Sequence, residues 1–148
     1  MENRFKEFTL LISQANRAIN KIKNNEMKKY GLKGTQVNCL FYIYESKDSL
    51  SAKDICILCD EDKAAISRTL KELECQGYIV CEKDDNKKKY NAILQLTAQG
   101  VKIAEIISKK IESIINYDES YISREELVAF YKTFNKIYAN LKTISESK

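Results

Sequence analysis

The chain has 148 residues, of which 44% are hydrophobic and 31% charged, and its formal net charge is +4. This length and composition are those of a soluble globular protein with one core. The chain has no histidine and only four glycines, none of them clustered, so the commonest general base and a Gly-rich phosphate loop are both missing; this argues against an enzyme.

No apolar run approaches the roughly 20 residues that span a bilayer. The first residues, MENRFKEF, lack the apolar centre of a signal peptide. We therefore expect a cytoplasmic protein without a membrane partner. The five cysteines are an odd number, so we expect reduced thiols rather than a disulfide framework.

The N-terminal segment carries an apolar stripe with alternating three- and four-residue steps, which predicts a long amphipathic helix. Its members are Phe5, Phe8, Ile12, Ala15, Ile19 and Ile22. Residues 1–36 also hold eight Lys or Arg against three Asp or Glu. This end of the chain is therefore basic as well as amphipathic.

Three helices are predicted in the central segment. The first covers residues 35–45, and the second opens at a capping box made by Ser51 and Asp54 and ends near Cys59. Asp62 is a good N-cap for the third, which runs to about Gln76 and stops at Gly77. The second and third helices are thus joined by a turn of about three residues.

Two short strands follow, YIVCEK and YNAILQL, separated by the polar tip DDNKKK. Thr97 then opens a long helix with an apolar stripe at Val101, Ala104, Ile107, Ile111 and Ile114. A last helix begins at a capping box made by Ser123 and Glu126. Its apolar stripe repeats the N-terminal spacing and comprises Leu127, Phe130, Phe134, Ile137, Leu141 and Ile144.

The two terminal stripes could fold back on the chain's own core. Two of them in so short a chain, however, have more apolar face than a small central domain can cover. We therefore predict that they form a homodimer interface. The dimerisation residues expected from the stripes are Phe5, Phe8, Ile12, Phe130, Phe134, Ile137 and Leu141.

The order of elements predicts a mainly α (α+β) fold, a winged helix-turn-helix with terminal dimerisation helices and a two-stranded β wing. We expect residues 35–116 to form the winged helix-turn-helix with its connecting long helix. Residues 1–34 and 117–148 would form the helical dimerisation region. All of these belong to one compact domain.

The helix after Asp62 has two different faces. Ile66, Leu70 and Leu73 fall on one side and predict a buried stripe. The opposite side has small side chains at its centre and positively charged side chains at its edges, which suits a DNA major groove. Arg68 would there reach a base edge or a phosphate. The residues predicted to contact DNA from this helix are Lys63, Ala64, Ala65, Ser67, Arg68 and Lys71. An ordinary solvated helix face is the plainer alternative.

The tip of the hairpin holds Lys87, Lys88 and Lys89 next to Tyr90. A charge run of this kind is usually a solvated loop, and two aspartates precede it. A compact cation cluster beside a recognition helix nevertheless suits a minor groove or the neighbouring phosphates. We therefore predict a second DNA contact by Lys87, Lys88, Lys89 and Tyr90.

The segment LSAKDICILCDEDKAAISRTLKELECQGYI, followed by LTAQG, resembles the MarR family of bacterial transcription regulators. The resemblance implies a homodimer that binds an inverted-repeat operator in double-stranded DNA, more often as a repressor. It also implies derepression by a small aromatic ligand or by thiol oxidation. Where the family's wing commonly has Asp-x-Arg, this chain has Lys88 and Tyr90, so a neighbouring lysine must supply the positive charge.

Cys56 and Cys59 form a C-x-x-C pair that is open to several interpretations. On a helix that starts at Ser51 they share an inward face with Ile55, which predicts packed thiols. Zinc would need about four ligands, and the remaining cysteines are too widely spaced to complete a set, so no metal or other cofactor is expected. A redox-sensing role for Cys56 and Cys59 stays an alternative.

Two further alternatives concern partners. A winged-helix module can bind another protein instead of DNA, and Glu61, Glu72 and Glu74 could neutralise the recognition face for that purpose. Tyr30, Tyr42 and Tyr44 could line a pocket for a small-molecule effector, although tyrosines at helical spacing are more often part of a core.

Overall fold

The computed structural model describes residues 4–82, 91–115 and 121–147. The chain divides into two compact units, Met1–Glu112 and Ser113–Lys148. The first unit contains the N-terminal helix as well as the helices and the hairpin of the central segment, and the second contains the C-terminal helix. The predicted assignment of residues 1–34 and 117–148 to dimerisation, and of 35–116 to the winged helix-turn-helix, stays a prediction.

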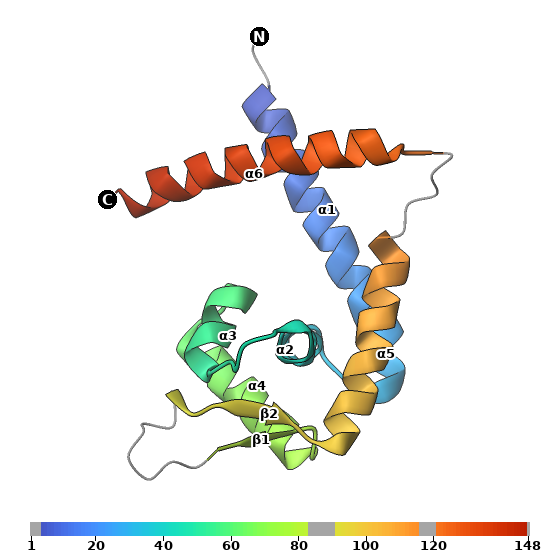
Figure 1. The fold of residues 1–148 in the computed structure, drawn as a ribbon, viewed down its shortest axis with the longest axis vertical. Helices are drawn as coiled ribbons and strands as arrows, with labels where there is room; N and C mark the ends of the chain where they lie inside the picture. The colour runs from blue at the N-terminus through green and yellow to red at the C-terminus, as the bar shows by residue number, and fades with distance from the viewer. Residues whose placement is uncertain (1–3, 83–90, 116–120, 148) are drawn as a thin grey trace. The chain divides into compact units, whose positions relative to one another are not determined.

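The elements of the described residues follow one another as predicted, with a short extra 3-10 turn near the start (Figure 1). They are α1 (Arg4–Met27), η1 (Lys28–Tyr30), α2 (Gly34–Glu45), α3 (Ala52–Cys59), α4 (Lys63–Cys75), β1 (Ile79–Cys81), β2 (Leu94–Leu96), α5 (Ala98–Ile115) and α6 (Arg124–Glu146). The predicted winged helix-turn-helix fold is confirmed.

The ends of α3 and α4 are fixed by local hydrogen bonds. The Asp54 N–H donates to Ser51 Oγ at 3.4 Å, and the Ser51 N–H donates back to Asp54 Oδ2 at 2.8 Å. Asp60 adopts a left-handed conformation with φ of 53° and ends α3. Asp62 Oδ1 accepts from the Ala65 N–H at 2.8 Å and so starts α4. The turn between the two helices is thereby only three residues long.

Replacing Ser51 with alanine is expected to lower the free energy of unfolding by about 1 kcal/mol, because the hydroxyl that caps α3 is lost. The hydroxyl and the N–H of Ser51 also lower the pKa of Asp54. The cap's contribution is therefore present above the unfolded-state pKa of Asp54 and lost as the pH falls through the lowered folded-state value. Urea unfolding at neutral and acidic pH measures both effects. Ser49→Ala, on the exposed loop before this cap, is the matched control, and an equal loss there would contradict the assignment.

The two strands form an antiparallel pair in which Ile79 lies opposite Leu96 and Cys81 opposite Leu94. A single bridge between Ser51 and Ile93 ties β2 to the segment that precedes α3. The Leu94 N–H donates to the Leu50 carbonyl at 2.9 Å in the same place. The hairpin is therefore held to the helix-turn-helix by backbone hydrogen bonds as well as by side chains.

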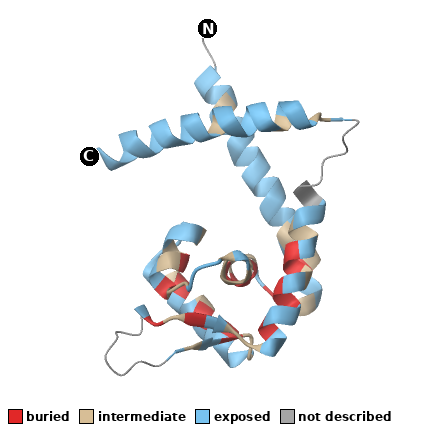
Figure 2. Cartoon of the chain, in the orientation of Figure 1, coloured by how far each residue is buried: buried red, intermediate tan, exposed pale blue. Residues whose placement is uncertain are grey.

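The core of the first unit lies where α2, α3, α4, the hairpin and α5 face one another (Figure 2). Its fully or almost fully buried members include Val37, Leu40, Ile55, Ile66, Leu73, Ile79, Leu94 and Ile107. Gln36 is also buried, and its amide donates to Glu72 Oε2 at 2.9 Å. This hydrogen bond joins α2 to α4 and fixes one face of α4 against the core.

No helix among the described residues is long and apolar enough to cross a membrane.

Candidate nucleic-acid interface

Helix α4 has a buried face and an exposed face, as its sequence predicts. Ile66, Leu70 and Leu73 are buried against the core. On the other side the exposed residues are Lys63, Ala64, Ser67, Arg68 and Lys71. Ala65 is half-buried, so it lies at the edge of the exposed surface. We call these six residues, Lys63, Ala64, Ala65, Ser67, Arg68 and Lys71, the α4 face.

One acidic residue of α4, Glu72, is held on the side of α2. Glu72 accepts the Gln36 amide at 2.9 Å and pairs with Lys33 Nζ at 3.4 Å. Both partners lie on the α2 side, so Glu72 is directed away from the exposed basic residues. Among the described residues, neither Arg68 nor Lys71 forms an ion pair. The α4 face therefore keeps positive charges that an anionic partner can reach.

The wing is described only at its base. Across the hairpin, the Gln95 side chain donates to Glu82 Oε1 at 3.0 Å. Lys87, Lys88, Lys89 and Tyr90, the predicted contacts of the wing, lie outside the described residues. Their DNA contact stays a prediction.

Helices α1 and α6 carry apolar side chains that are exposed within this chain. On α1, Phe5 is 75% exposed, and Ile12, Ile19 and Ile22 of the predicted stripe are also exposed. Phe8 is half-buried. Leu10 and Leu11 are exposed as well, so the apolar surface of α1 is wider than the stripe.

Helix α6 begins at the predicted capping box, in which the Glu126 N–H donates to Ser123 Oγ at 3.2 Å. No described residue of α6 is buried. Phe130 stacks on Phe134 with 5.5 Å between ring centroids. The exposed large apolar side chains of α6 are Val128, Phe130, Tyr131, Ile137, Tyr138, Leu141 and Ile144. Val128, Tyr131 and Tyr138 are not part of the stripe predicted from the sequence. The exposed apolar surface of α6 is therefore wider than that stripe.

Cys56 and Cys59 on α3 are less buried than the packed thiols that the sequence predicts. Ile55 is fully buried, whereas Cys56 and Cys59 are half-buried and pack at the edge of the core. Cys39 of α2 is fully buried, and a hydrogen bond with Cys39 lowers the pKa of Cys59. The sequence did not reveal this proximity, because Cys39 and Cys59 lie 20 positions apart and on different helices. Within the ranges that the structure describes, no three Cys, Asp or Glu side chains are grouped as metal ligands.

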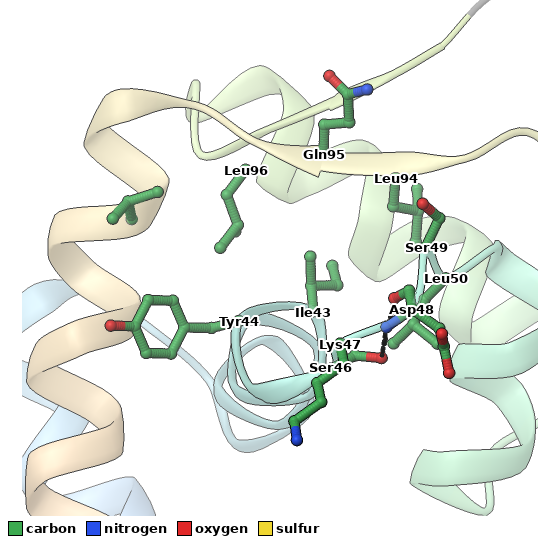
Figure 3. A pocket seen from close by; sticks show the side chains of 11 residues that line it. Ile43, Tyr44, Ser46, Lys47, Asp48, Ser49, Leu50, Leu94, Gln95 and Leu96 are labelled. Atoms are coloured by element: carbon green, nitrogen blue, oxygen red, sulfur yellow. Dashed lines mark hydrogen bonds between the residues drawn. The ribbon is translucent and has the colours of Figure 1, made fainter.

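An open hollow lies beside the C-terminal end of α2, bounded by the loop that follows, by β2 and by the start of α5 (Figure 3). Ile43 and Leu96 point toward one another across it, and the Tyr44 ring extends toward α5. Of the three tyrosines considered for an effector pocket, only Tyr44 lines this hollow. Tyr30 and Tyr42 pack against the core instead.

The three-helix arrangement, the short turn before α4 and the hairpin define a winged helix-turn-helix protein. Residues 30–89 match the model of the MarR family, which is the family that the sequence resembles. The match covers the segment LSAKDICILCDEDKAAISRTLKELECQGYI, on which the resemblance of the sequence rests. None of the curated proteins matches the chain in sequence.

Several solved structures share the fold over nearly the whole chain. A MarR protein from Peptoclostridium difficile superposes with a TM-score of 0.82 at 20% identity and covers 97% of this chain and 92% of its own. MepR of S. aureus in its DNA-binding conformation gives a TM-score of 0.80 at 19% identity, over 90% and 98%. A MarR-family regulator from Listeria monocytogenes, complexed with 26mer DNA, gives 0.78 at 23% identity, over 95% and 90%.

Proposed function

We propose that this protein is a sequence-specific DNA-binding transcription regulator that acts as a homodimer. The observation that carries the proposal is the α4 face. It presents small residues, Ala64 and Ser67, between the exposed cations Lys63, Arg68 and Lys71, while its opposite side is anchored in the core. A helix with this division of faces can lie in a major groove, where Arg68 would meet base edges and the lysines would meet phosphates.

The structures of similar fold support this use of the helix. The Listeria monocytogenes protein and S. aureus MepR have both been solved in complex with DNA. The similarity to these two proteins includes the winged helix-turn-helix segment, which also matches the MarR family. We extend DNA binding to this chain on that basis, together with the exposed charges of α4.

The exposed apolar residues of α1 and α6 support homodimer formation. Large side chains such as Phe5 and Phe130 are more than half exposed in the single chain. A second copy that covers these helices would remove them from water and would stabilise the dimer. The dimerisation residues we propose are Phe5, Phe8, Ile12, Phe130, Phe134, Ile137 and Leu141. A symmetric dimer presents two copies of α4, so its operator would be an inverted repeat in which the half-sites are about one helical turn apart.

The finer parts of the proposal concern regulation. We propose that the protein is a cytoplasmic repressor, in keeping with its family resemblance. The wing lysines, Lys87, Lys88 and Lys89, would add phosphate contacts that strengthen binding to any sequence. A small aromatic effector would lower operator affinity, and Tyr44 beside the open hollow is the tyrosine best placed to meet one.

Selection of bound sequences from random duplex DNA tests the proposal, with the mass of the free protein measured by light scattering. We expect an enriched inverted repeat and a mass of two chains. A variant with Lys63, Arg68 and Lys71 replaced by alanine should enrich nothing. A control that removes three exposed cations elsewhere, Lys102, Lys109 and Lys136, should still enrich the repeat. Selection that enriches no motif, while the protein remains dimeric, would favour a winged-helix module that binds a protein.

A further inference from the structure

A polar network joins the start of α2 to α4 beside the α4 face. Gln36 on α2 is only 2% exposed, and its amide nitrogen donates to Glu72 Oε2 at 2.9 Å. Lys33 Nζ lies 3.4 Å from the same carboxylate oxygen. We call Lys33, Gln36 and Glu72 the α2–α4 network.

The orientation of the Gln36 amide is fixed from the α2 side. Its Oε1 accepts the backbone N–H of Lys33 at 2.9 Å. A backbone N–H can only donate, so the amide oxygen must face it and the amide NH2 group must face Glu72. The neighbouring Val37 and Leu40 are fully buried and anchor this part of α2 in the core. The donor that reaches Glu72 is therefore held in place by the core.

Glu72 is the acidic residue of α4 that would otherwise reach Arg68. Side chains three or four positions apart on a helix are neighbours, and for Arg68 these positions hold two alanines, Lys71 and Glu72. Of these four, Glu72 is the one that can form an ion pair with a guanidinium. Its carboxylate instead binds the two donors of the α2 side, and Arg68 forms no ion pair within residues 4–82, 91–115 and 121–147.

We propose that Gln36 and Lys33 are positioning residues for DNA recognition by α4. They hold the Glu72 carboxylate on the α2 side and thereby leave the Arg68 guanidinium available to a base edge. A carboxylate released from the network would pair with Arg68 along the helix, and its negative charge would repel the DNA phosphates. The effect on DNA binding rests on the proposed function, whereas the hold on Glu72 does not.

Two substitutions release Glu72 in different ways. Gln36→Met keeps the length of the buried side chain and removes its amide, whereas Lys33→Met removes the cation from a side chain that is 74% exposed. Each is combined with Glu72→Gln, which keeps the shape of that side chain and removes its negative charge. Circular dichroism checks that every variant is folded, and Lys33→Met takes the place of Gln36→Met in both measurements if Gln36→Met unfolds the chain.

NMR of the free protein tests the hold on Glu72 without DNA. The chain has four arginines, so the side-chain Nε–H signals are few, and comparison with Arg68→Lys identifies the signal of Arg68. We expect this signal to shift in Gln36→Met and to return toward its original position when Glu72→Gln is added. A signal that Gln36→Met leaves unchanged, or a shift that persists in the double variant, would overturn the proposal.

Fluorescence anisotropy with the selected operator tests the consequence for DNA binding. We expect Gln36→Met to weaken binding about three- to tenfold, because the released carboxylate competes with DNA for Arg68. Glu72→Gln should raise affinity at least about threefold more in that background than in the otherwise unchanged protein. A purely structural role of Gln36 predicts no such difference, because removing a charge does not repair a misplaced helix.

Glu74→Gln is the matched control, since it removes the same charge from another exposed position of α4. It should not restore operator binding in the Gln36→Met background. Restoration by Glu74→Gln equal to that by Glu72→Gln would mean that only net charge matters, and it would overturn the proposal. Unchanged operator affinity of a folded Gln36→Met variant would overturn it as well.

The two measurements separate this proposal from the proposed function. If the protein binds no operator, the proposed function fails, and the NMR shift with its reversal by Glu72→Gln still supports the hold on Glu72. If the unchanged protein binds its operator and Glu72→Gln gives no additional gain in Gln36→Met, the positioning role fails and DNA binding stands.

Discussion

Replacing Gly100 with alanine is expected to lower the free energy of unfolding by at least the roughly 1–3 kcal/mol that is usual for overpacking. A Cβ at Gly100 would lie 1.9 Å from the Tyr78 carbonyl oxygen and 3.3 Å from Leu96 Cδ2. Backbone cannot move aside as the end of a flexible side chain can. The same carbonyl accepts the Thr97 N–H at 3.0 Å, so a shift of Tyr78 would also break the junction between the hairpin and α5.

A loss of stability would be the opposite of the usual effect, because alanine ordinarily stabilises a helix interior by roughly 0.5–1 kcal/mol relative to glycine. Urea unfolding of Gly100→Ala measures the net change. Gln99→Ala, one position earlier and exposed, is the matched control and should stay close to the unchanged protein. Greater stability of Gly100→Ala would mean that α5 and the hairpin are farther apart than this structure places them.

The limits of the helices could be predicted because the signals that set them are local. Ser51 and Asp54, Asp62, and Ser123 with Glu126 each make the cap that their spacing indicates. Gly77 adopts a φ of 75°, the left-handed conformation expected of a glycine after a helix. The buried stripe of α4 was also evident, since it depends only on helical periodicity and on an apolar core nearby.

The contacts that join distant elements could not be predicted. The hydrogen bond of Gln36 to Glu72 and the approach of Gly100 to Tyr78 each connect residues more than 20 positions apart. Their existence depends on how the helices pack, which local periodicity does not contain.

The proposed DNA interface also has one part that local periodicity predicted and one part that it did not. Periodicity placed Arg68 and Lys71 on the exposed side of α4, because the opposite side had to be buried. It did not show that Glu72 is held by Gln36 and Lys33 on the α2 side. Arg68 and Lys71 form no ion pair among the described residues. These two exposed cations favour contact with an anionic partner such as DNA.

Replacing Arg68 with alanine is expected to weaken binding to the selected operator by ~1–3 kcal/mol, on the order of 5- to 150-fold in Kd. Arg68 is exposed on α4, so its guanidinium can form two parallel hydrogen bonds with a guanine without first breaking an ion pair within the described chain. Fluorescence anisotropy with the operator and with a scrambled duplex measures the change. The loss should be much larger on the operator, because only base contacts carry sequence information.

Arg68→Lys is the matched variant, since it keeps the positive charge and removes the planar fork of the guanidinium. If Arg68 reads a base, lysine should recover little of the lost specificity, even though it restores much of the binding to the scrambled duplex. If Arg68 contacts only phosphate, lysine should restore both, and the alanine variant should lose affinity for all sequences equally and show a flatter salt dependence. Unchanged affinity of Arg68→Ala for the operator would remove Arg68 from the interface and would move recognition to Ser67, Lys71 or the wing.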